Sequence, residues 1–143
     1  MNVAAILKSK GKGVITTTPN TSLLDVAKLL ERNRIGCIVV EGEDGKVAGI
    51  VSERDIVRAV GQSGAKVLKD PVSTYMTRTV VTAREADTID RLMSEMTTHH
   101  FRHMPVVERG LLIGLVSIGD VVKMRIAEAE MEAAAMRQYI ATG

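Results

Sequence analysis

An internal repeat is the feature that most constrains the fold of this chain. When the sequence is shifted on itself by about 66 positions, Val14 to Thr16 align with Val80 to Thr82. The same shift aligns Leu23, Val26, Ala27 and Leu30 with Ile89, Leu92, Met93 and Met96. Both sets follow the spacing i, i+3, i+4 and i+7, which is typical of one face of an amphipathic helix. The repeat therefore predicts two similar halves.

Further signals occur at matching places in the two copies. Ser22 precedes the first helix, and Asp87 or Thr88 precedes the second, where a short polar side chain can cap free N–H groups. Two apolar runs, largely of β-branched residues, follow each helix, 38–40 and 47–51 in the first copy, 106–107 and 111–116 in the second. Turn residues separate the runs, Asp44-Gly45 in one copy and Gly110 in the other. A second helix follows each hairpin.

Each copy thus predicts the order strand, helix, strand, strand, helix, within the α+β class. One copy is too short to cover its own sheet, so we expect the two copies to pack together. We divide the chain into an N-terminal extension (1–13), repeat 1 (14–62), a linker (63–79), repeat 2 (80–126) and a C-terminal helical extension (127–143). The linker contains Asp70-Pro71, and we expect a short helical turn at 72–76.

Composition narrows the possible partners. The net charge is only +2, and the chain has no Trp, one Phe and two Tyr, so it lacks both the basic patch and the stacking aromatics of nucleic-acid-binding proteins. The longest apolar run, Leu111 to Ile118, is much shorter than the ~20 residues that cross a bilayer. No signal-type apolar region precedes Lys8. We expect no nucleic-acid partner, no membrane association and a cytoplasmic location.

A matching sequence word joins each hairpin to its second helix. Gly49 to Asp55 reads GIVSERD and Gly114 to Asp120 reads GLVSIGD, so both words share Gly, two apolar residues, Ser, two variable residues and Asp. A Ser followed three residues later by an acid is typical of a helix N-cap. The same helix start can also bind a phosphate, and the carboxylate can accept hydrogen bonds from ribose hydroxyls. The pattern alone leaves capping and nucleotide binding open.

The doubled unit and its Pro-containing linker resemble a pair of cystathionine-β-synthase (CBS) domains, over about Val14 to Ile126. Such a pair, or Bateman module, has a pseudo-two-fold axis and clefts that bind AMP, ADP, ATP, NAD(H) or S-adenosylmethionine in different members. The resemblance implies that Asp55 and Asp120 hold ribose hydroxyls, with Ser52 and Ser117 near the ribose or phosphate. It further implies that the adenine side is lined by Thr16, Thr17 and Thr82, and that backbone groups come from Gly36-Cys37 and His103-Met104.

The two copies differ in their charged residues. Arg54 can pair with a phosphate, but Gly119 stands at the equivalent place in the second word. Arg102 is predicted to be a second phosphate ligand, because a guanidinium makes two parallel hydrogen bonds and keeps its charge. The alternative is an ordinary surface arginine.

The sequence shows no catalytic or metal-binding set of residues. His99, His100 and His103 are close in sequence, but no neighbouring Asp, Glu or Cys completes a recognisable set of ligands. Cys37 is the single cysteine, lies in an apolar run, and is expected to be buried. No nucleophile has a matching base, so we expect no enzymatic activity and no metal.

The last helix carries the pattern of a coiled-coil seam. Apolar residues recur at alternating steps of four and three, at Val122, Ile126, Ala129, Ala133, Met136 and Ile140. The pattern predicts a long helix that contributes to a homodimer; the alternative is packing of this helix on its own module.

The leading hypothesis is therefore a regulatory module that binds an adenine nucleotide and signals, through dimer rearrangement, to an effector protein that the sequence does not identify. The alternative is a ligand-independent structural dimerisation module.

Overall fold

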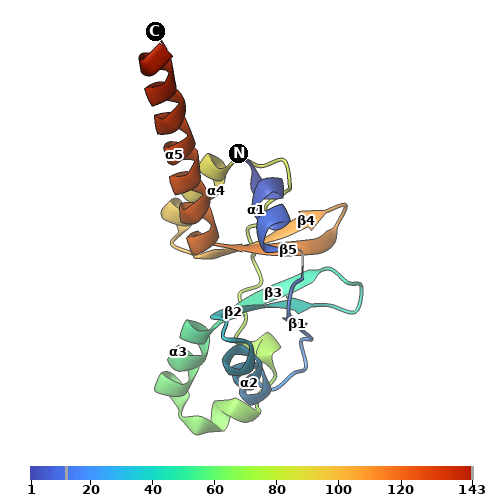
Figure 1. Ribbon diagram of the computed structural model, residues 1–143. Helices are drawn as coiled ribbons and strands as arrows, with labels where there is room; N and C mark the ends of the chain where they lie inside the picture. Colours follow the sequence, from blue (N-terminus) through green and yellow to red (C-terminus); the bar gives the residue numbers. More distant parts are fainter. Residues whose placement is uncertain (12, 143) are drawn as a thin grey trace.

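The structure, a computed structural model, describes residues 1–11 and 13–142. Two similar halves are stacked with their small sheets in the middle and their helices on the outer sides (Figure 1). The first half contains β1 (Thr16–Thr17), α2 (Leu23–Asn33), β2 (Cys37–Glu41), β3 (Val47–Ser52) and α3 (Glu53–Ser63). The second contains α4 (Ile89–His99), β4 (His103–Glu108), β5 (Leu111–Ser117) and α5 (Ile118–Thr142). The predicted α+β class, tandem repeat and long last helix are confirmed.

The first half forms a three-stranded sheet in the order β1-β2-β3, with β1 parallel and β3 antiparallel to β2. The side chain of Ser22 caps α2 by accepting the backbone N–H of Asp25 at 3.1 Å. Leu23, Val26 and Leu30 are the buried residues of this helix and pack in the core of the first half. The helical spacing read from the sequence therefore identifies the buried face.

The second half repeats this arrangement with one strand fewer. Thr88, and not Asp87, caps α4 by accepting the N–H of Arg91 at 3.1 Å. The strand predicted at 80–82 is wrong, because the segment makes only an isolated parallel bridge between Ala83 and Val106. Extension of this ladder toward residue 81 would need a hydrogen bond from the N–H of residue 105, and Pro105 has no N–H to donate.

The predicted N-terminal extension contains a helix, α1 (Val3–Lys10), that the sequence analysis missed. Val3, Ile6 and Leu7 are buried in the core of the second half. Backbone hydrogen bonds join the start of α1 to the loop before α4, from Val3 N–H to the Asp87 carbonyl at 2.9 Å and from Ala4 N–H to the Glu85 carbonyl at 3.0 Å. Helix α1 is therefore part of the second half of the molecule.

The linker holds two short 3₁₀ helices, η1 (Ala65–Lys69) and η2 (Val72–Thr74). The second confirms the predicted helical turn. Beyond it, Thr77 pairs with β3, because its N–H donates to the Ile50 carbonyl at 2.9 Å and its carbonyl accepts the Ile50 N–H at 3.0 Å. This pairing places the following extended segment at the boundary between the two halves.

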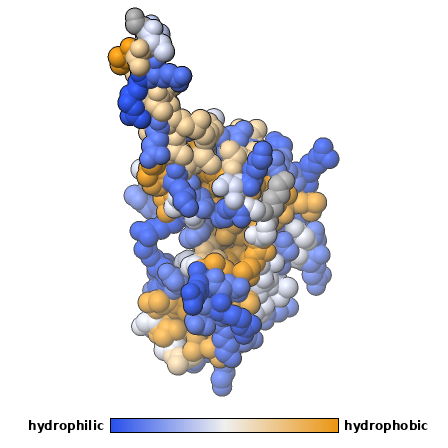
Figure 2. All heavy atoms as spheres, viewed as in Figure 1, coloured by the Kyte–Doolittle hydropathy of each residue, from blue (hydrophilic) through white to orange (hydrophobic). Residues whose placement is uncertain are grey.

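Helix α5 continues well past the second half and projects from the rest of the molecule (Figure 1). Ile126, Met136 and Ile140 of the predicted seam are 54%, 61% and 70% exposed. Figure 2 shows that the projecting part carries hydrophobic residues beside hydrophilic ones. Within the described residues, the outer turns of this helix therefore do not pack back on their own module.

Candidate functional site

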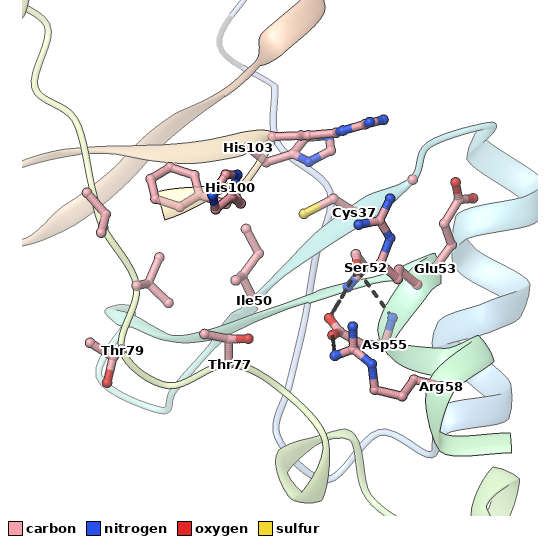
Figure 3. A pocket seen from close by; sticks show the side chains of 16 residues that line it. Cys37, Ile50, Ser52, Glu53, Asp55, Arg58, Thr77, Thr79, His100 and His103 are labelled. Atoms are coloured by element: carbon pink, nitrogen blue, oxygen red, sulfur yellow. Dashed lines mark hydrogen bonds and ion pairs between the residues drawn. The ribbon is translucent and has the colours of Figure 1, made fainter. Parts of the chain in front are cut away.

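A cavity of about 380 Å³ lies between the two halves, where the surface is hollowed (Figure 2). Its volume falls within the range of about 300 to 1,000 Å³ that is usual for small-molecule sites. The first half contributes Gly36, Cys37, Ile50, Ser52, Glu53, Arg54, Asp55 and Arg58. The segment after the linker contributes Thr77, Thr79, Val80 and Val81, and the second half contributes His100, Phe101, Arg102 and His103. Figure 3 shows side chains from all three segments around one space.

The first sequence word forms a capping box at the start of α3 (Figure 3). The Asp55 N–H donates to Ser52 Oγ at 3.3 Å, and the Ser52 N–H donates to Asp55 Oδ2 at 2.8 Å. The Ser52 hydroxyl also donates to Oδ2 at 3.1 Å. The other carboxylate oxygen, Oδ1, lies 3.9 Å from Arg58 Nη1. Capping therefore uses mainly one oxygen of Asp55, and the carboxylate still lines the cavity.

Arginine side chains line this cavity from both halves. Arg54 and Arg58 come from α3, and Arg102 precedes β4. Within the part of the chain that the structure describes, neither Arg54 nor Arg102 has a carboxylate oxygen within 4.0 Å of its guanidinium. Both cations are therefore free to pair with an anion that enters the cavity.

Two neutral groups complete the polar lining. Burial, and then the charge of Asp55, raises the pKa of the Cys37 thiol to about 12, so the predicted buried cysteine is a neutral thiol. Burial, and then the nearby cation of Lys10, lowers the pKa of His103 below its ordinary value. An uncharged imidazole can both donate and accept a hydrogen bond.

The cavity brings together seven of the residues predicted for nucleotide binding, namely Gly36, Cys37, Ser52, Arg54, Asp55, Arg102 and His103. The other predicted residues, Thr16, Thr17, Thr82, Met104, Ser117 and Asp120, lie outside it. Met104 is fully buried in the core of the second half. The hydroxyl of Thr17 donates to Thr21 Oγ1 at 2.8 Å.

Ser117 and Asp120 form the equivalent of the first cap in the second half. The Asp120 N–H donates to Ser117 Oγ at 3.1 Å, and the Ser117 N–H donates to Asp120 Oδ2 at 2.9 Å. Unlike Asp55, Asp120 also binds Lys10 of α1, whose Nζ lies 2.7 Å from Oδ2. Burial raises the pKa of Asp120, but the hydrogen bonds from Lys10 and Ser117 outweigh burial and lower it.

Several lining residues were not predicted from the sequence. Arg58 stands one helical turn after Asp55, and this spacing is the signal that could have identified it. Thr77 and Thr79 reach the cavity only because the linker pairs with β3, which no local pattern shows. His100 is the C-cap residue that follows α4, and its backbone is left-handed, with φ of 58°. Its side chain lines the cavity.

Comparison with known proteins identifies the class of this module. The CBS domain family model matches residues 9–62 and 72–126. The matches cover more than half of the chain, so this chain belongs to the CBS domain family and carries two such domains in tandem, a Bateman module. The CBS domain-containing protein CBSX3, mitochondrial, of Arabidopsis thaliana is 32% identical over 99% of this chain and 72% of its own length.

Solved structures show the same fold. The CBS-domain-containing protein ATU1752 of Agrobacterium tumefaciens is 46% identical, with a TM-score of 0.85 over 87% of this chain and 99% of that chain. The CBS domain protein PAE2072 of Pyrobaculum aerophilum, solved in complex with AMP, is 28% identical, with a TM-score of 0.75 over 84% of this chain and 89% of that chain. The tandem CBS fold of this chain thus occurs in a protein that binds an adenine nucleotide.

The described residues, 1–11 and 13–142, bear on two other kinds of site. They contain no group of three or more His, Cys, Asp or Glu side chains that could hold a metal ion. They also contain no helix that is long and apolar enough to cross a membrane.

Proposed function

We propose that this protein is a non-enzymatic regulatory module that binds an adenine nucleotide (AMP, ADP, ATP or NAD(H)) between its two CBS domains. The observation that carries the proposal is a single cavity lined by the Asp55 carboxylate, the start of α3 and free arginines from both domains. Each of these groups fits a different part of a nucleotide. The AMP complex of the Pyrobaculum aerophilum relative supports the same ligand class.

The ribose is assigned to Asp55. Its Oδ2 atom serves the capping box, whereas Oδ1 has only Arg58 at 3.9 Å among the described residues. A carboxylate oxygen at this place can accept hydrogen bonds from ribose hydroxyls. The apolar side chains of Ile50, Val80 and Val81 line the same cavity and offer a surface for the adenine ring.

The phosphate is assigned to Arg54 and Arg102. These guanidiniums come from different domains, so a phosphate bound by both would join the two halves of the module. The positive end of the α3 dipole adds to the attraction, because it favours an anion near the start of the helix. Binding at this boundary gives a physical route from ligand occupancy to the relative placement of the domains.

We propose that a homodimer and an effector protein read this change, partly through α5. The exposed seam of α5 supports a contact with a second copy, because an apolar stripe of this length is poorly tolerated in water. A cytoplasmic location is proposed as well, although the Arabidopsis thaliana relative is described as mitochondrial.

Ligand binding is tested by thermal unfolding with AMP, ADP, ATP, NAD+, NADH and S-adenosylmethionine, followed by calorimetric titration of those that raise the Tm. A ligand that binds only the native state raises the Tm in a concentration-dependent way. Asp55→Asn should weaken binding about 10- to 100-fold, because charged hydrogen bonds are worth about 1.5 to 3 kcal/mol. The matched control is Asp25→Asn, which changes an exposed aspartate in the first turn of α2.

The second candidate is a ligand-independent dimerisation module. The capping roles of Ser52 and Ser117 favour it, since helix capping by itself accounts for both side chains. If no adenine compound raises the Tm while the protein is a stable dimer, this second function replaces the first.

A further inference from the structure

The second domain carries the same cap as the first, but a cation from α1 is bound to it. Lys10 Nζ donates to Asp120 Oδ2 at 2.7 Å and to the Leu115 carbonyl at 2.9 Å. Asp120 is the counterpart of Asp55, and Leu115 is the counterpart of Ile50, because the two sequence words align residue by residue. The two halves therefore differ in what contacts the equivalent groups.

In the first domain, the Ile50 carbonyl accepts the backbone N–H of Thr77 at 2.9 Å. Thr77 then leads into Thr79 and Val80, which line the open cavity. In the second domain, the side chain of Lys10 supplies the hydrogen bond to the equivalent carbonyl of Leu115. The Lys10 side chain thus occupies the place in the second domain that Thr77 occupies in the first, and its ammonium group contacts Asp120.

The electrostatic surroundings of His103 agree with this placement. The charge of Lys10 lowers its pKa and the charge of Asp120 raises it, so both groups lie near the imidazole. His103 pairs with Ser117 across the β4-β5 hairpin and also lines the first cavity. The Lys10 and Asp120 pair therefore lies close to the boundary between the domains.

We propose that Lys10 closes the second cleft by occupying Asp120 as an internal cation, so that the chain binds one adenine nucleotide, at the Asp55 cleft. This inference rests on the proposed function. Lys10 neutralises the Asp120 carboxylate at Oδ2, so a ribose must compete with the ammonium group for this carboxylate. The pair is partly exposed, with 39% of the Lys10 side chain and 24% of the Asp120 side chain accessible. Such pairs are weak enough to open and close reversibly.

The test removes the ammonium group but keeps the length of the side chain. Lys10→Met is compared with Lys8→Met, which changes an exposed lysine on the same helix. Calorimetric titration with AMP and with ATP should give one bound nucleotide per chain for the parent and for Lys8→Met. Lys10→Met should bind a second equivalent, with at least a tenfold gain in affinity at that site. In a chain that also carries Asp55→Asn, Lys10→Met should bind one equivalent at the second cleft.

Two results separate this inference from the proposed function. One equivalent bound by both the parent and Lys10→Met would overturn closure by Lys10 and leave the nucleotide site intact. No binding to any variant would overturn both. The contact can also be tested without a nucleotide, by following the NMR chemical shift of the Asp120 side-chain carboxyl carbon as a function of pH. The pKa of Asp120 should rise in Lys10→Met and not in Lys8→Met, and an unchanged Asp120 pKa would refute the contact itself.

Discussion

Gly49 lies against Met76 so closely that a Cβ atom at position 49 would be 2.6 Å from the Met76 sulfur. It would also be 2.8 Å from the Thr77 carbonyl oxygen. Gly114 has the same relationship to α1, since a Cβ there would be 2.6 Å from Leu7 Cδ2. The glycine of each sequence word therefore lets another segment cross its strand closely, and in the first domain that segment also lines the cavity.

The first prediction concerns these two glycines. Gly49→Ala should lower the free energy of unfolding by about 1 to 3 kcal/mol, as overpacking of a filled site usually does. Gly114→Ala should cost less, because the atoms it meets are the flexible end of the Leu7 side chain, whereas position 49 also meets backbone. Urea unfolding of both variants measures the difference. A larger loss for Gly114→Ala would contradict this account of the motif.

The second prediction assigns the phosphate. Arg54→Ala should weaken binding of AMP about 10- to 100-fold, because the lost contact is a charged hydrogen bond. Binding of adenosine, which has no phosphate, should change little. Calorimetric titration of both ligands measures the two affinities, with Arg32→Ala on the exposed surface of α2 as the control. Equal losses for AMP and adenosine would show that Arg54 acts through structure and not through charge.

The third prediction concerns the thiol of Cys37. Its pKa is raised from 9.0 to about 12, so the folded protein holds a neutral thiol at pH 8 and should react very slowly with disulfide reagents. The unfolded thiol ionises first as the pH rises above 9.0, so burial of Cys37 should destabilise the fold progressively between pH 9.0 and about 12. Reaction with a chromogenic disulfide is compared with that of Ser63→Cys in a Cys37→Ala background. Rapid labelling of Cys37 in the native protein would contradict its burial.

The fourth prediction concerns His103, whose pKa lies below the ordinary value of 6.5. As the pH falls below 6.5, the unfolded imidazole takes up its proton first, so the native state loses stability. His103→Gln should remove this part of the acid sensitivity. Lys10→Met should raise the His103 pKa, because it removes a nearby cation. NMR titration of the imidazole measures the pKa, and an unchanged value in Lys10→Met would place Lys10 away from His103.

The sequence predicted those parts of the fold that depend on local periodicity. The buried faces of α2 and α4, the two hairpins and both capped helix starts follow from spacing and short polar residues. Helix α1 was missed because its three buried residues, Val3, Ile6 and Leu7, are too few to give a clear periodic pattern. The strand predicted at 80–82 does not form because Pro105, in the neighbouring strand β4, has no N–H to donate. This is a tertiary effect that the local sequence does not show.

The residues of the candidate site also fall into two groups, those that the sequence identifies and those that only the packing brings to the cavity. Asp55, Ser52 and Arg54 belong to one sequence word and could be identified from it. Thr77 and Thr79 reach the cavity through the crossing of the linker over Gly49, and nothing in their own neighbourhood indicates it. The contact of Lys10 with Asp120 joins residues 110 positions apart, so only the packing of α1 reveals that the surroundings of Asp55 and Asp120 differ.

The last prediction concerns α5 and the homodimer. Ile126, Met136 and Ile140 are 54%, 61% and 70% exposed, and they share the four-and-three spacing of a coiled-coil seam. Burial of this stripe against a second copy would remove apolar surface from water, and Ala129 and Ala133 would allow the two helices to approach closely. We therefore expect the parent protein to be at least a dimer in solution.

Substitution of the seam tests this expectation directly. Ile126→Asp combined with Met136→Asp places like charges in the predicted contact, where an unpaired buried carboxylate is strongly unfavourable, so the mass in solution should fall. The matched control, Ala134→Asp with Gln138→Asp, adds the same charge to exposed positions outside the seam and should keep the parent's mass. Multi-angle light scattering measures all three proteins at equal concentration. If the seam variant keeps the parent's oligomeric state while its helix content is unchanged, the interface lies elsewhere on the module, and α5 projects for another partner.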